Sequence, residues 1–115
     1  MDKYTTNDII TLYEEINYRC FSGDLPFPAV VIMDGITRKV ISGTQGWKFD
    51  FDGVCFPLHG EPKYLIGIAT GLKSDDFFNT VIHELIHVAC MEKWCYSGHG
   101  KKFNRVSQDI LEEIK

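Results

Sequence analysis

The sequence predicts an α+β fold: a small three-stranded sheet packed against a helix that carries a His-Glu-x-x-His motif, with further helices near the N- and C-termini. Three observations lead to this prediction. Apolar residues recur at helical spacing in three segments, which begin near positions 6, 76 and 100. Short runs rich in β-branched and aromatic residues lie between the first two of these segments. The length of 115 residues suits one hydrophobic core, so we expect a single domain over residues 1–115.

The first helix is expected to begin at Thr5 or Thr6, because threonine is a common helix cap. Asp8 then lies in the first turn, where the helix dipole favours an acidic side chain. The helix should end near Phe21, since residues 22–26 are typical of a turn. One face carries apolar residues at helical spacing, namely Ile9, Leu12, Tyr13, Ile16 and Cys20.

Three strands should follow this helix. Residues 29–33 form a β-branched run that predicts a buried strand. Residues 39–51 alternate apolar and polar positions around two glycines and predict a second strand, whose register the pattern leaves open. Residues 63–69 predict the third strand. The connections are expected to be turns at Asp34-Gly35 and Asp52-Gly53 and a loop at residues 57–62.

Two helices complete the predicted fold. The first should be capped by Ser74 or Asp75 and run from about residue 76 to residue 93 or 94, with acidic residues at its start. The last is predicted over residues 100–114. Its apolar face would consist of Phe103, Val106, Ile110 and Ile114.

The segment His83-Glu84-Leu85-Ile86-His87 is the most informative motif in the chain. Residues four apart on a helix lie one turn apart on nearly the same face, so the two imidazoles can bind one metal ion with a carboxylate beside them. This spacing is the signature of zinc metallohydrolases. Because the flanking residues are apolar, unpaired imidazoles there would be costly to bury, which favours a metal site over an ordinary surface helix.

A hydrolytic zinc site has three protein ligands and leaves a fourth position for water. The third ligand must come from another segment, because three side chains along one helix face cannot converge on a tetrahedral ion. This argues against Cys90. His99 is the best candidate, since it follows His87 by twelve residues and lies between two glycines that allow the chain to fold back. Alternatives for this third ligand are Cys95, Glu92 and Asp109.

Glu84 lies about 100° around the helix from His83, so it is poorly placed to bind the same ion. It can instead face the open coordination position. There it would accept a proton from a water molecule whose pKa the metal lowers to about 7. The remaining histidine, His59, lies in a loop beside prolines and is interpreted as a surface residue rather than a catalytic one.

Two separated motifs resemble those of the SprT-like metalloprotease family, which includes the Spartan proteases. His83-Glu84-x-x-His87 followed by His99-Gly100-x-x-Phe103 matches the family's HExxH and later HGxxF. Upstream, the family pattern NxxxFxGxLP is matched by Asn17, Phe21, Gly23, Leu25 and Pro26. The resemblance spans about residues 6–112.

This resemblance implies a zincin-like fold with zinc bound by His83, His87 and His99 and with Glu84 as the catalytic base. Known members cleave proteins, and the Spartan branch degrades proteins crosslinked to DNA. Many members extend into a cysteine-rich zinc ribbon or into DNA-binding segments, whereas this sequence ends at Lys115. It is also acidic, with a net charge of −4. The resemblance therefore supports proteolytic activity for this chain more directly than it supports a dependence on DNA.

Composition limits the partners that we expect. The chain has no long basic run and no apolar stretch that could span a membrane or act as a signal peptide, so a cytoplasmic monomer with reduced cysteines is expected. The cysteines are Cys20, Cys55, Cys90 and Cys95. DNA contact, if present, should be weak and salt-dependent. It should involve the basic residues beside the third ligand, Lys93, Lys101, Lys102 and Arg105.

The sequence thus predicts a zinc-dependent metalloprotease that acts on protein or peptide substrates. Two alternatives remain open. One is another zinc hydrolase, such as a metal-dependent ribonuclease. The other is a non-catalytic adaptor in which a fourth ligand, for example Cys95, His59 or an acidic residue, closes a structural zinc site.

Overall fold

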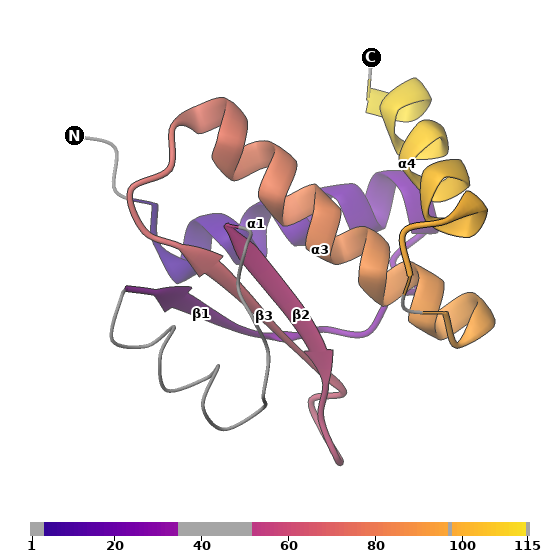
Figure 1. Cartoon of the computed structure of the whole chain (residues 1–115), viewed down its shortest axis with the longest axis horizontal. Helices are drawn as coiled ribbons and strands as arrows, with labels where there is room; N and C mark the ends of the chain where they lie inside the picture. The colour runs from indigo at the N-terminus through magenta and orange to yellow at the C-terminus, as the bar shows by residue number, and fades with distance from the viewer. Residues whose placement is uncertain (1–3, 35–51, 97, 115) are drawn as a thin grey trace.

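In the computed structural model, residues 4–34, 52–96 and 98–114 are described. The elements along these residues are α1 (Thr6–Phe21), β1 (Ala29–Met33), β2 (Gly53–Pro57), β3 (Tyr64–Ala69), α3 (Ser74–Trp94) and α4 (Lys101–Ile114). The described part of the chain therefore contains three helices and a three-stranded sheet (Figure 1). The predicted α+β class is confirmed at this level.

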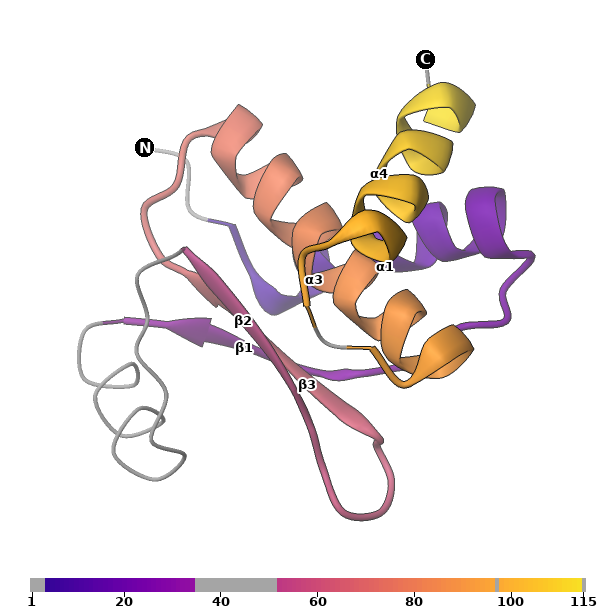
Figure 2. The ribbon, with the colours of Figure 1, turned by 45° about the vertical axis from the view of Figure 1, so that its right-hand side comes forward.

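The sheet is mixed, with the strand order β1-β3-β2. β1 runs parallel to β3, and Ala29 pairs with Leu65. β2 runs antiparallel to β3, and Cys55 pairs with Ile66. The helices lie on one side of the sheet, where α1 packs on β1 and α3 packs on β2 and β3 (Figure 2). Consequently β2 is an edge strand of the described sheet and lies directly beside α3.

The second strand of the described sheet, β2, was not predicted from the sequence. The predicted strand over residues 39–51 lies outside the described residues. The structure instead places β2 at Gly53–Pro57, where we expected a turn at Asp52-Gly53 and the beginning of a loop. The five residues of β2 are short and bounded by glycine and proline, so local propensity favours a turn there. Pairing with β3 over the whole length of β2 overrides that propensity.

Helix α1 begins where the sequence predicted. The hydroxyl of Thr5 accepts a hydrogen bond from the Asp8 backbone N–H at 3.2 Å, and the Asp8 carboxylate accepts one from the Thr5 N–H at 2.7 Å, which forms a capping box. Within α1, the buried side chain of Asn17 donates to the Leu25 carbonyl beyond the helix at 3.1 Å and accepts from the Leu25 N–H at 3.0 Å. Asn17 and Leu25, two residues of the upstream motif, thus fix the turn that leads into β1.

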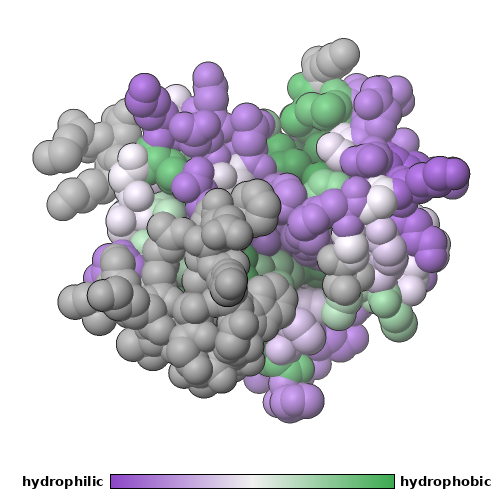
Figure 3. Space-filling model, viewed as in Figure 1, coloured by the Kyte–Doolittle hydropathy of each residue, from purple (hydrophilic) through white to green (hydrophobic). Residues whose placement is uncertain are grey.

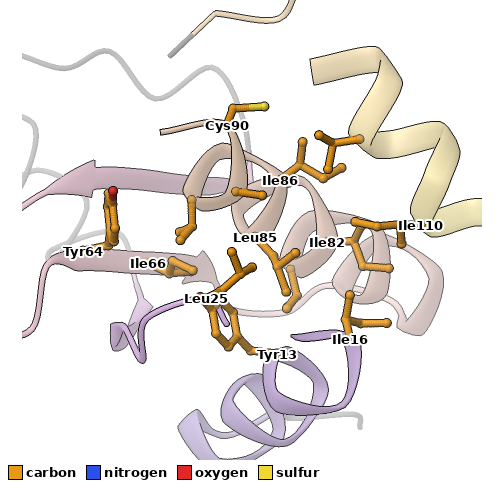
Figure 4. Close-up of a cluster of buried hydrophobic side chains, with 14 of the residues drawn as sticks. Tyr13, Ile16, Leu25, Tyr64, Ile66, Ile82, Leu85, Ile86, Cys90 and Ile110 are labelled. Carbon is orange, nitrogen blue, oxygen red and sulfur yellow. The ribbon is translucent and has the colours of Figure 1, made fainter. Parts of the chain in front are cut away.

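Helix α3 crosses the core, and most of its apolar residues are buried (Figure 4). The predicted cap is wrong: Lys73 occupies the cap position, without a side-chain hydrogen bond, and Ser74 lies within the helix. Asp75 and Asp76 occupy the first turn, where they interact favourably with the helix dipole. Around α3 the core includes Tyr13 and Ile16 from α1, Ile66 and Ile68 from β3, and Ile110 from α4.

Helix α4 packs against α3 and α1. Phe103, Val106 and Ile110 are buried, and Ile114 is partly buried, which confirms the predicted apolar face. Hydrophilic residues predominate over α3 and α4 on the face shown in Figure 3. Within the described ranges, no helix combines the length and the hydropathy needed to cross a membrane.

Candidate metal centre

Helix α3 holds two imidazoles at the edge of the core. The opposite side of the helix is fixed by packing, with Leu85 and Val88 fully buried. His83 and His87 lie one turn apart and are half-buried, and their ring centroids are 4.9 Å apart. Glu84 is also on this helix, and only 3% of its surface is exposed. Packing of the apolar side of α3 therefore positions both imidazoles.

His99 reaches the same place from the segment between α3 and α4. Its Nε2 atom lies 2.9 Å from Nε2 of His87. One ligand nitrogen from each of His83, His87 and His99 lies within 4.8 Å of the other two. Nitrogens bound to one tetrahedral zinc ion are about 3.3 Å apart, given Zn–N distances of about 2.0–2.1 Å. The three histidines are therefore close enough to bind one metal ion.

The other candidate ligands named from the sequence do not join this group within the described residues. Glu92 accepts a hydrogen bond from the Tyr64 hydroxyl at 2.7 Å and lies 3.7 Å from the Lys63 ammonium. Cys90, which the sequence already argued against as a ligand, is fully buried in the core. Three further candidates are exposed at other positions, namely His59, Cys95 and Asp109.

Phe103 packs against all three imidazoles from the first turns of α4. Its ring centroid lies 4.9 Å from the centroid of each imidazole ring, and the residue is buried. One rigid ring in contact with three imidazoles restricts the side-chain conformations that these histidines can adopt. The sequence assigned Phe103 to the apolar face of α4 and to a motif match, and its contact with the imidazoles became visible only in the fold.

Burial shifts the protonation of the two helical histidines in the direction that metal binding requires. Burial lowers the pKa of His87 to about 4, and the neighbouring His83 and His99 contribute to this shift. Burial likewise lowers the pKa of His83, with a smaller contribution from His99. Neutral imidazole is the form that binds a metal ion, so protons would compete only weakly with a metal ion for these two histidines near neutral pH.

The carboxyl group of Glu84 has the opposite shift. Burial raises its pKa to about 8, which suits a group that must both accept and release a proton near neutral pH. β2 approaches this carboxyl closely: a Cβ atom added to Gly53 would lie 2.9 Å from Oε2 of Glu84 and 2.6 Å from Cγ2 of Thr80. Gly53, which the sequence suggested only as a turn residue, thus allows the edge strand to contact α3.

A pocket of about 210 Å³ opens beside His83 and Glu84. Its other lining residues come from the beginning of β2 and from the first turns of α3, and they are Asp52, Gly53, Asp76, Asn79 and Thr80. Among the described residues, neither Asp52 nor Asp76 forms an ion pair. The pocket is therefore acidic on the side away from the imidazoles.

The four basic residues that lie near His99 in the sequence are all exposed, namely Lys93, Lys101, Lys102 and Arg105. Two of them lie over aromatic rings. The ammonium of Lys93 is 5.6 Å from the Trp94 ring centroid, and that of Lys102 is 5.7 Å from Trp94 and 5.4 Å from Tyr96. These contacts hold part of the basic cluster against the protein surface.

Comparisons with protein-family models, with curated proteins and with solved structures find no match to this chain. The resemblance to the SprT-like family therefore rests on the sequence motifs. The capacity to bind a metal ion rests separately on the positions of His83, His87 and His99.

Proposed function

We propose that this chain is a zinc-dependent metalloprotease of the SprT-like type, in which His83, His87 and His99 bind zinc and Glu84 is the catalytic base. The observation that supports this most strongly is the convergence of three imidazoles beside a buried carboxyl group that lines a pocket. Imidazole nitrogen suits zinc among the common metals. Three protein ligands would also leave a coordination position for water.

Zinc bound there would supply Lewis-acid activation of a water molecule and of the substrate carbonyl. Glu84 would move the protons: its carboxylate accepts one from the attacking water and returns it to the amine that leaves. The positive charge of the ion would favour the ionised form of Glu84 and oppose the effect of burial on its pKa. Burial also limits the access of bulk water to this carboxylate.

The substrate would bind as an extended peptide along β2. Within the described sheet β2 pairs only with β3, and its contact with Glu84 at Gly53 brings its edge close to the proposed base. A peptide that adds a strand to this edge uses its own backbone groups for affinity. Its scissile bond would then lie near the histidines.

The side chain next to the scissile bond would enter the acidic pocket. Asp52 and Asp76 line this pocket with carboxylates that are not ion-paired within the described residues. A lysine or arginine side chain would complement these charges. The substrate class that follows is an extended peptide with a basic residue beside the cleaved bond.

The same features count against the two rival functions. Carboxylates next to the site would repel the phosphates of RNA, so a ribonuclease is disfavoured. A structural zinc site needs a fourth protein ligand, and the described residues place no additional histidine, cysteine or acid in the group of three. RNA cleavage by the purified protein, or a fourth protein ligand on the bound ion, would support a rival instead.

DNA would be at most a weak partner of this protease. The exposed basic residues beside His99 offer few phosphate contacts, and the chain as a whole is acidic. Roughly two to four phosphate contacts imply binding that weakens steeply as salt increases. We expect modest stimulation of proteolysis by single-stranded DNA at low salt, reduced in a K101E/K102E variant. Absolute dependence on DNA would contradict this part of the proposal.

Metal analysis and a peptidase assay test the proposed function together. The purified protein should contain about one equivalent of zinc, and it should cleave an unfolded protein substrate. A chelator should abolish cleavage, and added zinc should restore it. A His59→Ala variant is the matched control, because His59 is exposed and outside the group of three. Zinc-loaded protein that cleaves neither proteins nor peptides would refute the proposal.

A further inference from the structure

Tyr96 lies just beyond the end of α3, close to the ligand that the helix does not carry. Its backbone N–H donates to the Cys90 carbonyl at 3.3 Å, which ties the residue to the last turn of α3. Its hydroxyl accepts a hydrogen bond from the Gly100 N–H at 2.7 Å. The Gly100 carbonyl in turn accepts from the Asn104 N–H at 3.0 Å, in the first turn of α4. Tyr96 therefore connects the end of α3 to the beginning of α4.

The two glycines beside His99 are explained by this tyrosine. A Cβ atom at Gly98 would lie 2.7 Å from the Tyr96 hydroxyl oxygen and 2.9 Å from the adjacent ring carbon. A Cβ atom at Gly100 would overlap the same hydroxyl oxygen. The backbone therefore lies directly against the phenol on both sides of His99. From the sequence, these glycines were expected to allow the chain to reverse. In the structure, their lack of a side chain leaves room for the phenol of Tyr96.

The phenol is itself held in place. It is partly buried and packs against the main core cluster. The Lys102 ammonium lies 5.4 Å from its ring centroid, within the range of a cation–π interaction. A hydroxyl carried on a fixed ring is a suitable anchor for a backbone N–H, because little conformational freedom remains to be lost when the hydrogen bond forms.

We propose that Tyr96 is a positioning residue for the third metal ligand: its hydroxyl holds the Gly100 backbone so that the His99 imidazole faces His87. The inference rests on the proposed metal centre. Without the hydrogen bond, the exposed His99 would have to be ordered when the metal binds, at a cost in affinity. Groups that orient metal ligands typically contribute 10- to 100-fold, as an order of magnitude, to metal affinity.

A Tyr96→Phe variant removes the hydroxyl and keeps the ring. Its zinc affinity, measured by competition with a chromogenic chelator, should fall about tenfold. In the metal-free protein, hydrogen exchange of the Gly100 amide should become faster. A Gly100→Ala variant should weaken zinc binding in the same direction. Tyr18→Phe is the matched control, since Tyr18 is 77% exposed on α1, and it should leave both measurements unchanged.

Combining the variants with His99→Ala separates this inference from the proposed function. If Tyr96 acts through His99, the change from tyrosine to phenylalanine should have no further effect on the zinc affinity of a His99→Ala protein. An unchanged zinc affinity in Tyr96→Phe, in a protein whose affinity does fall in His99→Ala, would overturn the role of Tyr96 alone. An unchanged affinity in His99→Ala would overturn the metal centre itself.

Discussion

The two halves of the candidate metal centre are built in different ways. His83 and His87 are one turn apart on α3, a helix of 21 residues whose other side is buried in the core. His99 is exposed and lies in a short connection between two helices. The first half is rigid because the core holds the helix. The second half depends on a few local contacts, which include Tyr96 and Phe103.

This difference suggests that the helical half determines where a metal ion binds, whereas the connecting half determines how tightly it is held. A helix that is required for the core cannot adapt to the ion. A connection can adapt, but the adjustment costs conformational entropy. The predictions below begin with the largest expected effect and test each half separately.

Glu84→Gln, in the rigid half, should cause the largest loss of activity. The amide cannot accept a proton from water, so hydrolysis should fall by about 10³-fold or more. Folding and zinc content should be retained, because burial already favours the neutral form of this side chain and the amide is similar in shape. Peptidase rates normalised to zinc content are the measurement, and Glu14→Gln on the exposed side of α1 is the control. Residual hydrolysis near the wild-type rate would remove Glu84 from the mechanism.

His99→Ala should separate metal affinity from stability. Loss of one of three ligands should decrease zinc affinity by more than the roughly 10- to 100-fold that loss of a ligand-orienting group costs. The melting temperature of the metal-free protein should change little, because His99 is exposed. In His87→Ala both quantities should decrease, since that imidazole is half-buried between Phe103 and the other histidines. Thermal scans with chelator and with excess zinc measure both effects. Equal melting temperatures for the two metal-free variants would contradict the division into two halves.

The rigid half was predictable from the sequence, because it depends on local spacing. The interval of four residues between His83 and His87 and the apolar residues around them define both the helix and its exposed edge. The cap of α1 was likewise predictable, since Thr5 and Asp8 are three residues apart.

The remaining features depend on contacts between distant segments, which no local pattern encodes. β2 was missed because its five residues are a strand only through their pairing with β3. The need for glycine at position 53 arises only because that strand approaches Glu84. The contact of Phe103 with the three imidazoles likewise arises only when α3, α4 and the segment between them come together. Tyr96 carried a weak signal: a tyrosine two residues before a pair of glycines that flank a histidine.

Phe103→Ala tests whether one aromatic side chain positions the histidines of both halves. Removing the ring should destabilise the fold by about 3 kcal/mol and should also weaken zinc binding, because the ring contacts all three imidazoles. Ile110→Ala on the same buried face of α4 is the control. It should cost a comparable amount of stability without changing zinc affinity in the folded protein. Chemical denaturation of metal-free protein and zinc titration give the two quantities. If both variants change zinc affinity equally, the contact of Phe103 with the imidazoles has no specific role.

The smallest expected effect concerns substrate preference in the acidic pocket. Asp52→Asn and Asp76→Asn should each reduce cleavage beside lysine or arginine by a few fold, since the lost attraction is between partly solvated charges. Cleavage beside uncharged residues should be unaffected. Asp75→Asn is a close control, because Asp75 is exposed in the same first turn of α3 but does not line the pocket. Cleavage sites in a peptide mixture, identified by mass spectrometry for each variant, provide the measurement. A preference for basic residues that persists unchanged in the Asp52→Asn/Asp76→Asn double variant would place the specificity outside this pocket.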